Sequence, residues 1–433
     1  MRRRCKLLTA LALCVALPSF AAQAQDKTLR LWTFLNPNGT EARENALKQI
    51  IAKFEAAHPG VKVQVEQQVW TQMTPKFLAA HASGTAPDVI WVHSEMLGKA
   101  ISGNTLADLN KLYFASRSDD GADLDNVFWQ FSQKDGAQYS VALTSGIFGL
   151  VYRMDLFEKA GIKPDSIRTW ADLEQAAAKL TTRSTDGNVT RWGLCQHFGK
   201  APNSSAIFIS TVLSKTGGKM FSSEGKADWA NPAGEEGLRR VVDLVQKAKV
   251  SPPDAINWTE DDMYDQFAAD RCAMATGFSS RVARLQQTLG KDKVGFMGYP
   301  SDDPGKPSPQ IVNAWFESVW SKGKNTKEAA EFVAYTVSPE ADRIWVTVGG
   351  TIPNRKSTLK ELQDFLAKPE NQYLGAAAEY IQKAGWFPPI DADIAGYRDF
   401  INVAIQKVLT GQATPKDALE EAQSGYNRKH GFK

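Results

Sequence analysis

Apolar and polar positions alternate in some parts of the chain and recur at helical spacing in others. Thr28–Phe34 alternates between the two kinds, which predicts a strand. The next segment predicts a helix, because its apolar residues fall on one face: Leu47, Ile50, Ile51 and Phe54. Val61–Glu66 alternates again and predicts a second strand. Strand, helix and strand at this spacing predict a βαβ unit with a parallel sheet.

The segment His81–Glu95 is the point around which we expect the first half of the chain to be organised. Within it, glycine and proline end a helix, and Asp88–Val92 predicts a buried strand that ends in polar residues. Ligands of open α/β sheets collect beyond the carboxyl ends of strands, where we expect a loop carrying His93, Ser94 and Glu95. These three residues are therefore candidate ligand contacts, and ordinary exposed loop residues are the alternative.

Two crossings between lobes are expected later in the chain. Tyr139–Leu143 and Phe148–Tyr152 predict two strands separated by residues 144–146, and a second crossing is expected at residues 298–300. Glycine in both segments permits the backbone rotation of a hinge. We predict two discontinuous lobes, residues 25–143 with 301–355 and residues 147–300 with 360–433. No strand is predicted after Leu359, and helix starts are expected at Thr169, Thr259, Ser338 and Thr414.

The length fits two domains of ordinary size, and the composition fits a soluble globular protein. The chain has 433 residues, of which 43% are hydrophobic and 23% charged. Its formal charge of +3 is small for this length, so we expect no nucleic-acid partner.

The N-terminus has the pattern of a secretory signal peptide. Arg2, Arg3, Arg4 and Lys6 precede the apolar run Leu7–Leu17, and residues 22–24 supply small residues at the cleavage spacing. We expect residues 1–24 to be removed and the mature protein to be periplasmic. Leu13 before Cys14 argues against lipid attachment.

Two cysteines remain after this cleavage, Cys195 and Cys272. They can form one disulfide or stay as buried thiols, and the sequence does not distinguish these states. Two cysteines alone do not build a metal site, and we expect no cofactor.

Four motifs, in this order and spacing, resemble the family 1 extracellular solute-binding proteins of ABC importers, the maltose-binding type. They are residues 83–89, residues 150–157 with 169–173, residues 273–277 and residues 349–355. The resemblance covers essentially the whole mature chain. It implies a two-lobed periplasmic-binding-protein fold with a hinge, a ligand in the interlobe cleft and delivery to a membrane permease. In one departure from the family pattern, Arg153 follows Tyr152 where asparagine is more usual, at a position that we interpret as structural.

The resemblance also implies ligand contacts from the loops that follow the strands. By position, these are Trp32, Trp70, His93, Ser94, Glu95, Ser145, Gly277, Arg281, Asn313, Trp315, Arg355 and Trp386. Aromatic faces stack on sugar rings while Glu, Asn, Ser and Arg bind hydroxyls, so the set suits a carbohydrate or polyol. With 12 tryptophans in the chain, a partly buried core residue is the alternative for each Trp, and Trp315 and Trp386 are favoured.

Other functions remain open at this point. The arginines leave room for an anionic ligand such as a sugar acid or a glycerol phosphodiester. An exported carbohydrate-active hydrolase is a further alternative, although no catalytic motif of the serine hydrolase, zinc protease or nucleotide-binding kind occurs in the chain. We expect a monomeric binding protein rather than an enzyme.

Overall fold

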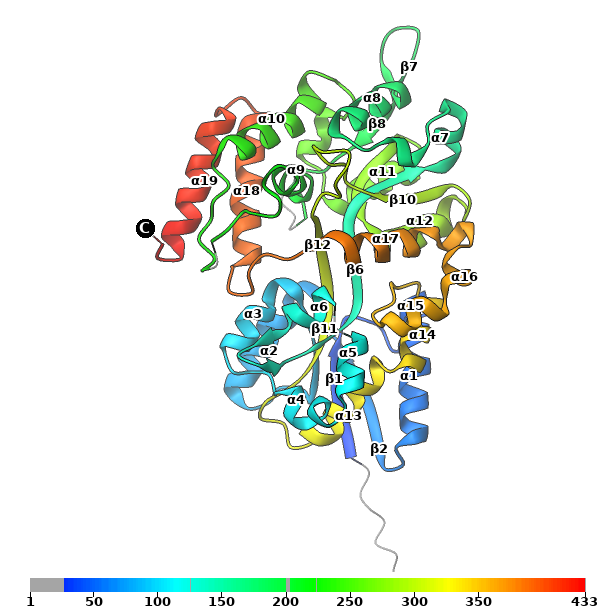
Figure 1. The fold of residues 1–433 in the computed structure, drawn as a ribbon, viewed down its shortest axis with the longest axis vertical. Coiled ribbons are helices and arrows are strands. Elements are labelled where there is room, and N and C mark those ends of the chain that lie inside the picture. Colours follow the sequence, from blue (N-terminus) through cyan, green and yellow to red (C-terminus); the bar gives the residue numbers. More distant parts are fainter. Residues whose placement is uncertain (1–26, 125, 200–202, 223, 433) are drawn as a thin grey trace, which may run out of the picture.

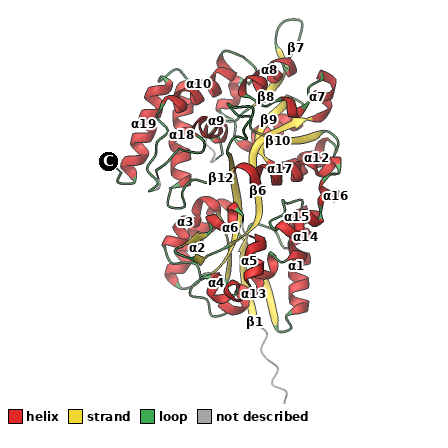
Figure 2. Cartoon of the chain, in the orientation of Figure 1, coloured by secondary structure: helices red, strands yellow, loops and turns green. Residues whose placement is uncertain are grey.

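The computed structural model describes residues 27–124, 126–199, 203–222 and 224–432. The predicted signal peptide, residues 1–24, lies outside this part. Figure 1 shows two lobes stacked along the long axis, and Figure 2 shows helices flanking the strands of each. Within the described residues, no helix combines the length and the apolar character needed to cross a membrane.

Ten strands are linked into one sheet that runs through both lobes, in the order β2-β1-β3-β11-β6-β9-β8-β7, with β10 added on β6 and β12 on β11. Their bounds are β1 Lys27–Thr33, β2 Val61–Gln67, β3 Val89–His93, β6 Val141–Arg153, β7 Thr182–Arg183, β8 Val189–Cys195, β9 Cys272–Phe278, β10 Val294–Gly298, β11 Gln310–Val319 and β12 Gly385–Trp386. A separate hairpin joins β4 Gln133–Lys134 to β5 Ala137–Gln138. The pairs β1–β2 and β1–β3 are parallel, as the βαβ pattern predicts.

Strand β6 belongs to both lobes. Its first part, Val141–Ile147, pairs with β11, and its second part pairs with β9 and β10. The prediction of two strands separated by residues 144–146 is therefore wrong. Ser145 and Gly146 pair with Ala314 and Asn313 of β11, and these cross-strand bonds override the weak strand propensity of the segment.

The helices divide between the lobes. Packed around β1, β2, β3 and the neighbouring part of β11 are α1 Ala42–Ala57, α2 Trp70–Ser83, α3 Ser94–Ser102, α4 Leu109–Leu112, α5 Ser118–Leu124, α6 Val127–Phe131, α13 Thr326–Thr336, α14 Pro339–Thr347 and α15 Lys356–Glu361. The second lobe holds α7 Met154–Ala160, α8 Trp170–Leu180, α9 Ala206–Thr216, α10 Pro232–Gln246, α11 Glu260–Ala268, α12 Val282–Leu289, α16 Gln363–Leu366, α17 Gln372–Ala384, α18 Ile394–Leu409 and α19 Pro415–Lys429. The lobe boundaries given above stay a prediction.

Two further expectations differ from the structure. His93 ends β3, and α3 begins at the next residue, so the expected loop is a direct junction from strand to helix. No strand is predicted after Leu359, but the structure has β12 there. A strand of two residues has no recognisable local pattern, and β12 exists only through its pairing with β11. The expected helix starts are confirmed, since the side chains of Thr169, Thr259, Ser338 and Thr414 each accept a hydrogen bond from the first turn.

A disulfide joins Cys195 at the end of β8 to Cys272 at the start of β9, with the two Cα atoms 5.7 Å apart. The alternative of two buried thiols is thereby excluded. The bond ties together two strands separated by 77 residues of sequence within the second lobe.

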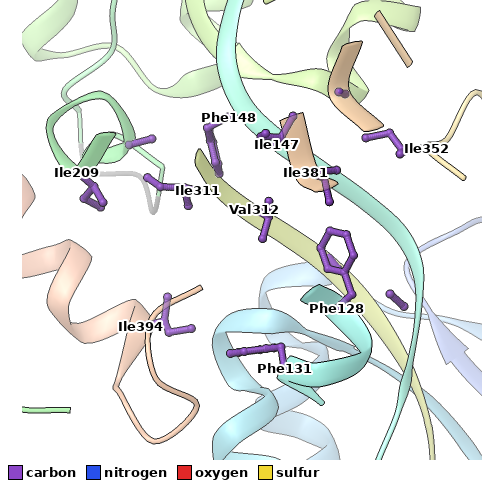
Figure 3. Close-up of a cluster of buried hydrophobic side chains, with 14 of the residues drawn as sticks. Phe128, Phe131, Ile147, Phe148, Ile209, Ile311, Val312, Ile352, Ile381 and Ile394 are labelled. Atoms are coloured by element: carbon purple, nitrogen blue, oxygen red, sulfur yellow. The ribbon is translucent and has the colours of Figure 1, made fainter. Parts of the chain in front are cut away.

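Apolar side chains from both lobes meet where β6 and β11 pass between them. Figure 3 shows Ile147 and Phe148 of β6 beside Ile311 and Val312 of β11, with side chains of α6, α9, α17 and α18 around them. All four of these strand residues are buried. This core holds the crossing strands in place and so fixes the positions of the strand ends on either side.

Candidate functional site

Four aromatic rings gather where β1 and β3 end toward the second lobe. His93 lies against Trp315 with 4.9 Å between ring centroids, and Phe34 lies against the same indole at 4.8 Å. Trp70, at the start of α2, follows at 6.4 Å from His93. Trp70 is 48% exposed, which is unusual for so large an apolar side chain in this protein. The group therefore forms a continuous aromatic cluster at these strand ends, with Trp70 as its exposed member.

An ion pair joins the two lobes beside these rings. The Glu95 carboxylate, in the first turn of α3, accepts a hydrogen bond from the guanidinium of Arg398, in the first turns of α18. Both side chains are nearly inaccessible, with 10% and 2% of their areas exposed. A buried pair of this kind is costly to break on one side only, so each partner holds the other in position.

Hydrogen bonds extend this pair into the second lobe. Arg398 also donates to Asn203 Oδ1 at 3.3 Å, and Asn203 Nδ2 donates to Glu260 at 2.6 Å. Tyr264 donates to the other oxygen of Glu260 at 3.1 Å and accepts from the Phe278 amide at 2.8 Å. Carboxylates, an amide and a phenol are thus fixed in one connected network opposite the aromatic rings.

Gly277 and Arg281 both lie against Tyr264 of this network. A Cβ at Gly277 would lie 2.5 Å from the Tyr264 hydroxyl, so only glycine lets the tyrosine approach β9. Arg281 lies over the Tyr264 ring at 5.5 Å and pairs with Asp261 at 3.1 Å. We call the following set the interlobe cluster: Phe34, Trp70, His93, Glu95 and Trp315 from the first lobe, and Asn203, Glu260, Tyr264, Arg281 and Arg398 from the second.

Burial sets the protonation states of the cluster. It lowers the pKa of His93 despite the neighbouring Glu95, so the imidazole is neutral at pH 7 and its 3.7 Å contact with that carboxylate is not an ion pair. Burial also raises the pKa of Tyr264 well above the ordinary value, which keeps the phenol a hydrogen-bond donor. Arg43 of α1 lies over the Phe34 ring at 5.3 Å. Its pKa is lowered, first by burial and second by the nearby positive charge of Arg281.

Three predicted contacts lie in or beside the crossing strands. Ser94 donates to Asn313 at 3.2 Å, and both side chains are buried. Ser145 is also buried, and its hydroxyl has no hydrogen-bond partner among the described residues. These groups form a polar layer next to the interlobe cluster.

Two other predicted contacts are not brought to the interlobe cluster. Trp32 donates its indole N–H to Glu66 on the neighbouring strand β2 at 2.7 Å. Arg355 is buried, and its guanidinium donates hydrogen bonds to Asp120 and Asp123 of α5 and to the Val337 carbonyl. Each of these side chains therefore has its polar groups engaged within the first lobe.

Trp386 lines a cavity of about 500 Å³ between α6 of the first lobe and residues 218–222 of the second, together with Phe131 and the neighbouring Phe387. Its indole N–H donates to the Gly218 carbonyl at 2.9 Å. The strand β12 that carries it pairs with β11 at Gln310 and Ile311, four residues from Trp315. Trp315 is not among the residues that line this cavity.

The residues that sequence reasoning missed are Phe34, Asn203, Glu260, Tyr264 and Arg398. Arg398 could have been recognised from the sequence pattern, because it falls on the apolar face of α18 with Ile394, Ile401 and Ile405. A charged residue in such a stripe needs a buried partner. Asn203 and Glu260 gave no comparable signal, since polar residues before a helix and acidic residues in its first turn are ordinary. Among the described residues, no group of three or more His, Cys, Asp or Glu side chains could hold a metal ion.

Comparisons with known proteins identify the family. The family model described as bacterial extracellular solute-binding protein matches residues 38–343. Among curated relatives, an sn-glycerol-3-phosphate-binding periplasmic protein of Pectobacterium atrosepticum is 23% identical, over 97% of this chain and 95% of its own.

Solved structures share the fold. An ABC substrate-binding protein from Listeria monocytogenes in complex with cycloalternan superposes with a TM-score of 0.78 at 24% identity, covering 94% of this chain and 100% of its own. A solute-binding protein from Thermotoga lettingae bound with α-D-tagatose has a TM-score of 0.77 at 22% identity, covering 93% and 99%. At these identities the likeness establishes the two-lobed fold.

Proposed function

The chain belongs to the bacterial extracellular solute-binding protein family and is the solute-binding component of an ABC transporter, and we propose that its solute is a neutral sugar or polyol held at the interlobe cluster. The observation that carries this proposal is the position of an aromatic face opposite a hydrogen-bonded polar network. Aromatic rings bind the C–H face of a sugar ring, and fixed donors and acceptors bind its hydroxyls.

The charges of the cluster favour a neutral solute over an anionic one. Two cations of the cluster, Arg281 and Arg398, lie beside its two carboxylates, Glu95 and Glu260. Adding an anion to a balanced and desolvated site would leave a charge without compensation, which is costly. The ligands named for the Listeria and Thermotoga proteins are carbohydrates, which agrees with this choice.

A ligand-induced rise in unfolding temperature tests the proposal. The mature protein is screened against neutral mono- and oligosaccharides, polyols, sugar acids and glycerol phosphodiesters. A ligand present at about 100 times its Kd stabilises by about 2.7 kcal/mol, which corresponds to about 3 °C for a chain of this length. Shifts confined to the anionic compounds would exclude the neutral solute in favour of the anionic alternative.

We further infer that the protein works in the periplasm as a monomer, without catalysing a reaction, and that it hands its solute to the permease subunits. The N-terminal signal pattern supports export, and the pairing of each carboxylate in the cluster with an arginine or a hydrogen-bond donor leaves no free acid and base. Release of chromophore from a nitrophenyl glycoside in proportion to the protein concentration would refute the non-enzymatic assignment.

A further inference from the structure

A second cavity, of about 410 Å³, lies in the second lobe on the side away from the interlobe cluster. It is walled by Trp192 and by residues that follow β8 and α10, with Leu409 at the end of α18 closing one side. Arg398 and Leu409 lie 11 residues apart on the same helix, which places them about 17 Å apart along its axis. The cavity is therefore separate from the interlobe cluster.

The wall of this cavity is apolar and aromatic. Trp192 is half-buried, and Phe198, Pro252 and Ile256 continue the surface. The volume falls in the range of small-molecule pockets, which are lined mostly by apolar groups with a few polar ones. The wall thus suits the apolar body of a small ligand.

Two cations lie at the rim of this cavity, and none of the described residues that line it is acidic. Arg183 donates only to backbone carbonyls, those of Gly187 and Lys249, at 3.3 Å each. Within the described part of the chain, neither Arg183 nor Lys249 has a carboxylate within salt-bridge distance. Both cations are exposed and remain available to a ligand anion.

The backbone at Lys249 adds a second observation. Its φ is 51°, in the left-handed region, where a residue with a Cβ costs about 1 kcal/mol or more relative to glycine. Glycine would adopt this conformation without strain, but the chain has a lysine at this position. The strained backbone therefore places a cation at the rim of the cavity.

We propose that this cavity is a second ligand site, for a small molecule with an aromatic or branched aliphatic body and one carboxylate. The body lies against Trp192 and the prolines, and the carboxylate lies between Arg183 and Lys249. The inference rests on this lobe alone and does not depend on the solute proposed for the interlobe cluster.

Calorimetric titration of the mature protein with phenylacetate and with its neutral isostere, phenylacetamide, tests the site. We expect one phenylacetate per chain and at least about tenfold weaker binding of the amide. The double variant R183Q/K249Q should weaken phenylacetate binding at least about tenfold, whereas R239Q/K247Q, which removes the same charge from α10 and the residue after it, should stay within about twofold.

Leu409→Trp provides an independent check, because it fills the cavity and keeps both cations, and it should abolish phenylacetate binding. Binding of the interlobe solute should be unchanged in all these variants. Absence of phenylacetate binding up to about 10 mM would overturn the proposal, as would equal affinity for the amide or binding that survives both R183Q/K249Q and Leu409→Trp.

Discussion

Removing the disulfide between Cys195 and Cys272 should destabilise the second lobe by an amount that its loop length sets. The perturbation is the double replacement Cys195→Ala/Cys272→Ala. Alanine is the choice because both positions are fully buried, where a serine hydroxyl would be left without a partner. The bond closes a loop of 77 residues, and loop-closure entropy for that length amounts to about 4.5 kcal/mol at 25 °C.

This free energy converts into a temperature shift that depends on how the lobes unfold. If the mature chain of about 410 residues unfolds as one unit, its unfolding entropy predicts a fall in Tm of about 5 °C. If the second lobe, of about 220 residues, unfolds separately, the fall is about 10 °C and is confined to one of two transitions.

Scanning calorimetry of the parent, the double alanine variant and the reduced parent measures these shifts. The reduced parent is the control for lost packing, since it keeps both sulfur atoms. Both forms should lose similar stability if the closed loop is the cause. A loss below about 1 kcal/mol in the reduced parent would refute the loop-closure reasoning.

Two further predictions concern buried charges. Glu317 on β11 accepts hydrogen bonds from Trp91 and Thr336, and burial raises its pKa to about 7. The folded state then holds a proton that the unfolded state loses above about pH 4.5, so stability should fall by roughly 3 kcal/mol as the pH rises through 4.5 to 7. Urea unfolding at pH 5 and pH 8 should show a larger loss in the parent than in Glu317→Gln, which keeps the pH dependence of Asp342, whose pKa burial raises to about 6. Equal pH slopes in the two proteins would contradict the prediction. Arg398→Met leaves Glu95 buried without its cation, so the lobes should separate and small-angle scattering should show a larger radius of gyration. The control is Lys99→Met, which removes a half-exposed ion pair with Asp393 and should leave the radius of gyration unchanged. Equal radii for the two variants would contradict this role of Arg398.

The sequence predicted the parts of the fold that local chemistry determines. The βαβ unit, the buried strand β3 and the four capped helix starts follow from periodicity and capping, and the structure has them where they were expected. The junction at His93 was recognised as a strand end, although the helix there begins one residue later rather than after a loop.

Features that depend on distant partners could not be predicted in the same way. β6 is one strand because β11 pairs across Ser145 and Gly146, and β12 is a strand only beside β11. Arg355 looked like a cleft arginine, but Asp120 and Asp123, more than 230 residues earlier in the chain, engage its guanidinium. The second-lobe half of the interlobe cluster was missed for the same reason, because Asn203, Glu260 and Arg398 become neighbours only through packing.

Binding of a neutral sugar or polyol at the interlobe cluster is tested most directly by calorimetry on Trp315→Ala, with the solute that the stability screen identifies. Trp315 carries the aromatic face between Phe34 and His93, and truncating such an anchor commonly costs roughly 2 kcal/mol, or about thirtyfold in Kd. Trp386→Ala, which alters a cavity that Trp315 does not line, is the matched control, and Ser94→Ala should cost less than Trp315→Ala. We predict a loss of at least about thirtyfold for Trp315→Ala in a folded protein and near-parent affinity for Trp386→Ala. Unchanged affinity in Trp315→Ala, or the larger loss in Trp386→Ala, would contradict binding at the interlobe cluster.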